Sequence, residues 1–137
     1  MRLVIDTNRI IAGFLKSSSS RGVLFNPAFR FYAPDVVVME ITKHSKYLRE
    51  KAHLTEEESE QILSLLISRV TLVPFEHFQE SYSRACSLME EIDKDDAPFL
   101  AVGIALKLDG IWTADWHFLQ QKVLPVYSNR DLECREQ

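Results

Sequence analysis

The stretch Met1-Arg2-Leu3-Val4-Ile5-Asp6-Thr7-Asn8 places three large aliphatic side chains directly before a carboxylate. No polar residue interrupts residues 3–5, which is typical of a strand that helices cover on both faces in a parallel sheet. Ligands of such sheets bind beyond the carboxyl ends of the strands. Asp6 is therefore predicted to lie at a reactive edge, where Thr7 and Asn8 hold it or cap the next helix. The alternative is that Asp6 is itself only a turn or capping residue.

The composition predicts one soluble domain over residues 1–137. Hydrophobic residues make up 46% of the chain and charged residues 26%, which are ordinary values for a globular protein. Cys86 and Cys134 are too few for a disulfide framework, and without a C-x-x-C pair they do not suggest zinc, so we expect a cytoplasmic protein. No apolar run approaches the length of a membrane span, so no membrane partner is expected.

A short basic segment stands out in an otherwise acidic chain. The net charge of −4 argues against a protein that binds nucleic acid with its whole surface. Residues 43–53, however, carry four Lys or Arg and two His against one Glu. This basic strip, with Lys43, Lys46 and Arg49, is a candidate RNA-binding surface, although a solvated helix face is the more common explanation for such a run.

Five short apolar segments are predicted to be strands, and helical patterns separate them. Connections that are too long for hairpins imply right-handed crossovers and a mainly parallel sheet. The predicted fold class is therefore a three-layer α/β/α domain. Beyond residues 3–5, the predicted strands are 30–33, 69–73, 111–113 and 126–128.

Helical periodicity and capping signals predict six helices between these strands. Thr55-Glu56-Glu57-Glu58 is a capping box that begins one of them. Asn8 and Asp35 are expected to cap two others, whereas the serines of residues 17–20 are expected to form a loop. The remaining predicted helices are 9–16, 21–29 with an interruption near Pro27, 36–51, 77–91 and 97–108.

Carboxylates follow predicted strands or begin predicted helices at several points. Asp115 follows the fourth strand, and Asp93, Asp95 and Asp96 precede the apolar helix 97–108. N-capping and the helix dipole would stabilise that helix by about 0.3–1 kcal/mol per exposed acid. These two effects explain one or two of the three acids.

Glu40 interrupts the apolar run of residues 36–41, in a helix that must bury much of that surface. An ionised carboxylate is costly there unless it is paired or bound to a cation. The alternative is that Glu40 lies on the one polar stripe of the helix, with His44 one turn further along.

Carboxylates that converge on a small pocket repel each other, so some of them would be forced to take up protons. A divalent metal ion removes this problem. Mg²⁺ and Mn²⁺ bind through a few carboxylates and complete their coordination with water and phosphate oxygens. No Cys or His grouping in the sequence suits zinc. Such an ion polarises a phosphodiester and activates a water, which indicates nuclease chemistry.

Four ordered motifs resemble those of the PIN-domain ribonucleases, above all the small VapC-type toxins of toxin–antitoxin pairs. They are Asp6-Thr7-Asn8, Glu40 early in the helix after the second strand, Asp93-x-x-Asp96-x-Pro98-Phe99-Leu100-Ala101, and Thr113-x-Asp115-x-x-Phe118. The resemblance covers nearly the whole chain. It implies a sheet in the order 3-2-1-4-5 and cleavage of RNA that depends on Mg²⁺ or Mn²⁺.

The same resemblance assigns roles to single residues. The implied metal-binding and catalytic acids are Asp6, Glu40, Asp96 and Asp115, with Asp93 in reserve, and the residues that support them are Thr113 and Asn8. Two positions depart from the family pattern. Arg9 stands where many members have an aliphatic residue, and His117 where many have a second acid.

Two other classes of function compete with the nuclease hypothesis. A signalling receiver domain would need an acid after the third strand, where this chain has Val73-Pro74-Phe75. A degenerate PIN fold would bind RNA or protein without cleaving it, although here all four acid positions are filled.

The resemblance implies three partners: an RNA substrate, a possible cognate antitoxin, and a second copy of the chain in a homodimer or larger homo-oligomer. The apolar content of residues 23–25 and 62–67 also favours self-association. A dimer would align two acid pockets and two basic strips into a longer groove for RNA.

Overall fold

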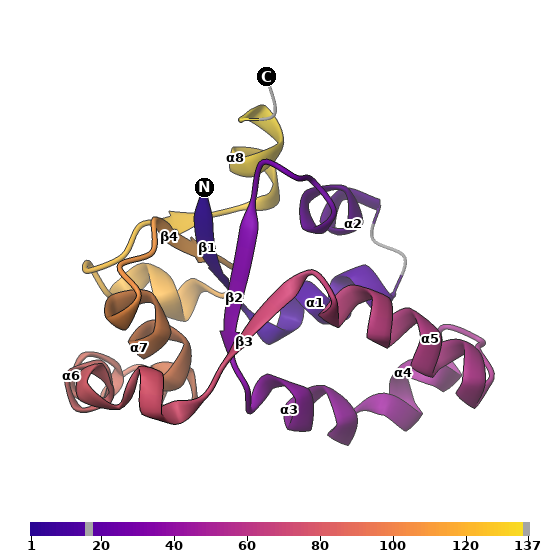
Figure 1. The fold of residues 1–137 in the computed structure, drawn as a ribbon, viewed down its shortest axis with the longest axis horizontal. Coiled ribbons are helices and arrows are strands. Elements are labelled where there is room, and N and C mark those ends of the chain that lie inside the picture. Colours follow the sequence, from indigo (N-terminus) through magenta and orange to yellow (C-terminus); the bar gives the residue numbers. More distant parts are fainter. Residues whose placement is uncertain (16–17, 136–137) are drawn as a thin grey trace.

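A five-stranded sheet forms the centre of the protein in the computed structural model, which describes residues 1–15 and 18–135 (Figure 1). The strands run in the order β3-β2-β1-β4-β5, and all neighbouring pairs are parallel. The predicted fold class and strand order are therefore confirmed. The strands are β1 (Arg2–Ile5), β2 (Arg30–Pro34), β3 (Val70–Val73), β4 (Gly110–Trp112) and β5 (Val126–Tyr127).

Helices cover both faces of this sheet (Figure 1). On one face α6 packs against α7, and on the other α1 packs against α2 and α5. The helices are α1 (Thr7–Phe14), α2 (Ser18–Leu24), α3 (Val37–Lys43), α4 (Ser45–Lys51), α5 (Glu56–Ile67), α6 (Gln79–Met89), α7 (Ala97–Ala105) and α8 (Asn129–Cys134). Three 3₁₀ turns add to them: η1 (Phe75–His77), η2 (Lys94–Asp96) and η3 (Trp116–Gln120). No helix in the described part of the chain is long and apolar enough to cross a membrane.

The central strand β1 is buried on both faces, as its sequence predicts. Leu3, Val4 and Ile5 are all 0% exposed, and full burial of such a side chain contributes roughly 1.5–3 kcal/mol. α7 lies close against this strand. A Cβ atom on Gly103 would collide with Leu124 and would come within 3.1 Å of Val4 Cγ2, so glycine permits the approach. This packing fixes the helix that follows Asp96.

Two predicted helix caps are wrong. Asp6, rather than Asn8, is the N-cap of α1, and its carboxylate accepts the backbone N–H of Asn8 at 3.4 Å. The alternative role considered for Asp6 is therefore real, although it occupies only one of the two carboxylate oxygens. Asp35 does not cap α3, because that helix begins after Val36 without a side-chain cap bond.

The single helix predicted over residues 36–51 is divided at His44 into α3 and α4. Just before the break, the Thr42 hydroxyl donates a hydrogen bond to the Val38 carbonyl at 2.7 Å. This kind of bond bends helices, and β-branched residues such as Thr42 also have modest helix propensity. The break divides the basic strip between two helices, because Lys43 lies on α3 whereas Lys46 and Arg49 lie on α4.

The serine run is helical where it is described, so the predicted loop is wrong for residues 18–20. The side chain of Asn129 donates to the hydroxyls of Ser19 and Ser20 at 3.2 and 3.1 Å, and Ser19 also bonds to Glu133. These contacts come from α8, a helix that the sequence analysis did not predict. Lys16 and Ser17, the end of one predicted helix and the start of the predicted loop, lie outside the described residues.

The apolar helix predicted over residues 97–108 ends at Ala105. Lys107 takes a left-handed conformation with φ 53°, and Leu108 donates its backbone N–H to the Gly103 carbonyl at 3.0 Å. This is the hydrogen-bond pattern of a Schellman motif. The predicted strands and the predicted helix 77–91 agree with the structure within two residues at each end.

Much of the surface expected to mediate self-association is inside the protein. Val23, Leu24 and Leu66 are at most 2% exposed, so they pack in the core of a single chain. Phe25 and Leu65 remain available, at 39% and 58% exposed. The apolar composition of these segments therefore reflects core packing more than a dimer interface.

Candidate functional site

A pocket of about 590 Å³ lies where β1 and β4 end. Its walls come from the first turn of α1, the end of α3, η2 with the start of α7, and the segment after β4. Acids that are far apart in the sequence therefore meet here. The lining includes the predicted acids Asp6, Glu40, Asp93, Asp96 and Asp115, together with Asp95, Asn8 and Lys43.

Asp6 is a buried carboxylate, 6% exposed, and both of its oxygens are engaged. One oxygen accepts the Asn8 backbone N–H, and the other accepts the Thr113 hydroxyl at 2.6 Å. The Thr113 hydroxyl oxygen in turn accepts the backbone N–H of Asp115 at 2.9 Å. Burial raises the pKa of Asp6 despite these opposing hydrogen bonds. Thr113 thus ties the end of β1 to the segment after β4.

Asp96 differs from Asp6 because one of its carboxylate oxygens, Oδ2, is buried without a hydrogen bond to any described residue. It is the residue before α7 but makes no side-chain cap bond. Among the described residues, its buried Oδ2 atom has no hydrogen-bond partner. The pKa of Asp96 is raised to about 7. Burial is the largest cause, and the negative charges of Asp93 and of three further acids of the pocket add to it. Capping therefore does not explain Asp96.

Asp93 is the capping acid of the trio. Its Oδ1 atom accepts the backbone N–H of Asp95 at 3.0 Å and begins η2. The other carboxylate oxygen of Asp93 stays free of that bond and faces His117. Asp95 is exposed, and no side-chain bond ties it to the pocket acids among the described contacts. Of the three competing acids, Asp93 and Asp96 therefore turn toward the same point.

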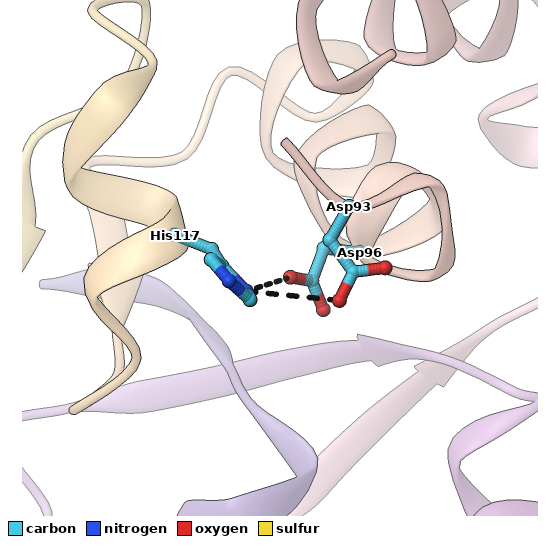
Figure 2. Close-up of side chains that lie close together, drawn as sticks. All are labelled: Asp93, Asp96 and His117. Atoms are coloured by element: carbon cyan, nitrogen blue, oxygen red, sulfur yellow. Dashed lines mark ion pairs between the residues drawn. The ribbon is translucent and has the colours of Figure 1, made fainter. Parts of the chain in front are cut away.

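His117 faces Asp93 and Asp96 from η3 (Figure 2). Its Nδ1 atom lies 3.3 Å from Asp115 Oδ1, 3.6 Å from Asp93 Oδ2 and 3.8 Å from Asp96 Oδ2. Asp93, Asp96 and His117 each offer one ligand atom within 4.8 Å of the others. The sequence analysis noted His117 only as a departure from the family pattern and did not include it among the metal-binding residues. The sequence signal was Asp115-x-His117, in which Asp115 caps η3 by accepting the His117 backbone N–H at 2.9 Å.

Glu40 lines the pocket from α3 and is partly buried. Its Oε2 atom accepts the Thr7 hydroxyl at 2.7 Å, so Thr7 holds Glu40 and not Asp6. The side chain of Asn8 also lines the pocket, whereas its backbone makes the bond to Asp6. The first turn of α1 therefore positions two acids at once, one through a hydroxyl and one through a main-chain N–H.

A family model described as PIN domain matches residues 4–133 of the chain. The chain belongs to the PIN domain family. A search of curated proteins finds no match for it. Among solved structures, it resembles a chain of the crystal structure of VapBC2 from Rickettsia felis bound to a DNA fragment from their promoter. The TM-score is 0.72 at 17% identity, over 93% of this chain and 98% of that one, so the likeness is one of fold.

The donor set of this PIN domain fits a divalent metal ion. Carboxylate oxygens dominate it, and hard cations such as Mg²⁺ and Mn²⁺ prefer such ligands. Within the described ranges, the buried Asp96 Oδ2 and His117 Nδ1 atoms both lack a hydrogen bond. Buried polar atoms without partners are rare in folded proteins, and a metal ion bound here would give both atoms a partner. Burial and then the negative charge of the neighbouring acids raise the pKa of Asp96, and a bound cation would offset both effects.

The basic strip of this PIN domain reaches the pocket at one end only. Lys43 lines the pocket, whereas Lys46 lies exposed on α4. Arg49 lies 3.7 Å from Glu56, so part of its charge is compensated. The strip therefore lies along one edge of the acidic pocket. Its positive potential is weaker than the number of Lys and Arg residues in the sequence indicates.

Proposed function

We propose that this PIN domain is a metal-dependent endoribonuclease that hydrolyses the phosphodiester bonds of RNA. The observation that carries the proposal is the convergence of acids from four separate segments on one pocket, among them an Asp96 that no cap bond explains. Asp6, Asp93 and Asp115 each cap a helix or turn, but capping does not require these acids to meet in one pocket. Their repulsion is a cost that a bound cation would offset.

In this proposal Asp6 and Asp96 bind Mg²⁺ or Mn²⁺. Glu40 and Asp115 contribute directly or through water, and Asp93 is the reserve ligand. When bound, the ion polarises a phosphate oxygen and activates a water for attack. The family assignment supports these roles, and Asp96 also belongs to the group of Asp93, Asp96 and His117 whose ligand atoms lie within 4.8 Å of one another.

Hydroxyl groups and main-chain N–H groups keep these acids in place. Thr113 bonds to the Asp6 carboxylate and to the Asp115 main chain, and Thr7 bonds to Glu40. Asn8 supports Asp6 through its N–H. Residues that orient metal ligands in this way usually change metal affinity or activity by about 10–100-fold when replaced.

RNA would approach along the basic strip, with Lys43 beside the pocket and Lys46 and Arg49 further out. Positive side chains beside the acidic pocket attract the negatively charged RNA backbone toward it. The net charge of −4 makes this local strip the natural route for a polyanion.

We further propose that the chain is the toxin of a toxin–antitoxin pair and acts in the cytoplasm. Its fold matches that of a chain in a VapBC2 structure over 93% of its length. A cognate antitoxin is the proposed partner. The start of α3, with its N-cap, offers it Val36, Val38 and Met39, which are 40%, 37% and 64% exposed near the pocket residue Glu40. A homodimer is also proposed, for which Phe25 and Leu65 remain exposed.

Isothermal titration with Mn²⁺ and Mg²⁺, combined with cleavage of a structured RNA pool, tests the nuclease proposal. We expect metal binding, cleavage that EDTA abolishes, and recovery when Mn²⁺ or Mg²⁺ is restored. An absence of binding at millimolar metal, with and without RNA, would show that the pocket is a structural acid cluster. Binding of metal and RNA without cleavage would indicate a degenerate PIN domain instead.

A further inference from the structure

The side chain of His117 is placed where a metal ligand would be. Two ligands that are each about 2.1 Å from one ion lie roughly 3.0 Å apart at a right angle and about 4.2 Å apart on opposite sides. The Nδ1 atom of His117 is 3.3, 3.6 and 3.8 Å from oxygens of Asp115, Asp93 and Asp96. All three distances fall within that interval.

Hydrogen bonding within the protein does not account for this placement. The Nδ1 atom is buried and has no hydrogen bond to any described residue, and the same is true of the facing Asp96 Oδ2 atom. The backbone that carries the imidazole is nevertheless held in position. Its N–H is bound by Asp115, and the next residue, Phe118, is 0% exposed in the core. The Nδ1 atom therefore lies at ion-pair distance from the acids without a hydrogen bond to any of them among the described residues.

We infer that His117 is a metal ligand through Nδ1, and that this PIN domain binds a first-row transition ion such as Mn²⁺ in preference to Mg²⁺. The inference rests on the proposed function. Mg²⁺ strongly prefers oxygen ligands, whereas transition ions accept an imidazole nitrogen together with carboxylates. Ligation through Nδ1 requires a neutral ring with its proton on Nε2. A single histidine among the carboxylates thus changes the choice of metal.

Pulsed electron paramagnetic resonance of Mn²⁺ bound to the full chain tests this directly, because it detects nitrogen coordinated to the ion. We expect nitrogen coupling in the wild type and its loss in His117→Gln. His44 also lines the pocket, so the coupling must persist in His44→Gln. Its absence from the wild-type spectrum would overturn the inference without any variant, so a folding defect in His117→Gln does not obscure the result.

Metal selectivity provides a second readout. His117→Asp restores an all-oxygen donor set, and we expect it to lower the ratio of Mn²⁺ to Mg²⁺ affinity by about tenfold or more, on the scale of other changes around metal ligands. His77→Gln, an exposed histidine away from the pocket, should leave the ratio unchanged. An unchanged ratio in His117→Asp would overturn the inference.

The two proposals fail in different ways. Mn²⁺ binding and RNA cleavage without nitrogen coupling would contradict the role of His117 while leaving the nuclease proposal intact. A wild type that binds neither Mn²⁺ nor Mg²⁺ would overturn both.

Discussion

Two helices of this protein begin with acids, and the acids behave in opposite ways. At the start of α5, the Glu58 backbone N–H donates to Thr55 Oγ1 at 3.1 Å, and Glu58 accepts the Thr55 N–H at 3.0 Å. The hydrogen bonding of Thr55 to the Glu58 carboxylate lowers the pKa of this exposed side chain. At the start of α7, Asp96 makes no cap bond, and burial raises its pKa to about 7.

The difference shows that an acidic helix start is not in itself a functional signal. α8 repeats the pattern of α5, since Ser128 and Asp131 form a second capping box and the pKa of Asp131 is lowered. In both capping boxes the charged carboxylate is stabilised by N–H donors. The ionised Asp96 is destabilised by burial and by other acids, which are features expected of a site that binds a cation.

The largest expected effect separates Asp96 from its neighbour. Asp96→Asn should lower RNA cleavage by about 100-fold or more, because losing a metal ligand costs at least as much as losing a residue that orients one. Asp95→Asn is the matched control and should lose little activity, since consecutive positions at a helix start face different ways. Initial rates in Mn²⁺ measure both. An essential Asp95 with a dispensable Asp96 would show that the pocket has been assigned to the wrong acid.

The second effect concerns stability without metal. In EDTA, Asp96→Asn should raise the free energy of unfolding by about 1–2 kcal/mol, because one pKa unit corresponds to about 1.36 kcal/mol and solvent screening reduces the full shift. Glu58→Gln should lower Tm, because it removes a charge that the cap stabilises. Added Mg²⁺ or Mn²⁺ should stabilise the wild type more than Asp96→Asn. Thermal melts measure these differences. A Tm in EDTA that is lower for Asp96→Asn than for the wild type would show that Asp96 acts as a structural cap.

Asp6→Asn should stabilise the metal-free protein less than Asp96→Asn. Both substitutions remove a negative charge from the pocket. Asp6, however, accepts hydrogen bonds from Asn8 and from the Thr113 hydroxyl, and an amide cannot accept both with the same geometry. A gain in Tm for Asp6→Asn that equals the gain for Asp96→Asn would show that these two bonds contribute little.

A smaller effect is expected in the pH dependence of stability. The pKa of Asp96 rises on folding from 3.8 to about 7, so the folded protein binds this proton more tightly than the unfolded chain. The metal-free wild type should therefore lose stability as pH climbs through that interval and regain it on acidification. Asp96→Asn should flatten this slope. Glu58 and Asp131 have the opposite effect, because folding lowers their pKa values. Their carboxylates stabilise the fold at pH values above their pKa in the unfolded chain, and this stabilisation is lost as the pH falls. Urea unfolding across the interval measures the slopes.

The smallest expected effect concerns the basic strip. Lys46→Glu should weaken RNA binding several-fold at low salt and less at high salt, because exposed charges are screened. Arg49→Glu should have a different effect, since it also removes the ion pair with Glu56. Fluorescence titration of RNA onto a protein with Asp96→Asn would measure binding without cleavage. A salt-independent loss would argue that Lys46 acts through the fold.

Local pattern was sufficient for much of the fold. The uninterrupted aliphatic run before Asp6 predicts a buried parallel strand, and β1 is the central strand, in which these three residues are fully buried. The Thr55–Glu58 capping box appears with both of its hydrogen bonds. One failure has a distant cause: Asn129 stabilises the helical serines from more than 100 residues away, and no local window of sequence contains that contact. The break at His44 has a local companion, the bond from the Thr42 hydroxyl to the Val38 carbonyl, but the helical pattern of residues 36–51 outweighed that signal.

By itself, the sequence determined which acids stand at strand ends and helix starts, because periodicity and capping chemistry are local properties of the chain. It also determined that the sheet is parallel, since the connections are too long for hairpins. The tertiary structure decided what each acid does. Asp93 became a cap, the Asp96 Oδ2 atom has no hydrogen bond to any described residue, and His117 was brought within 3.8 Å of both acids. The reason is physical: burial and electrostatic repulsion depend on distances across space, which are set only when the separate strands and helices pack together.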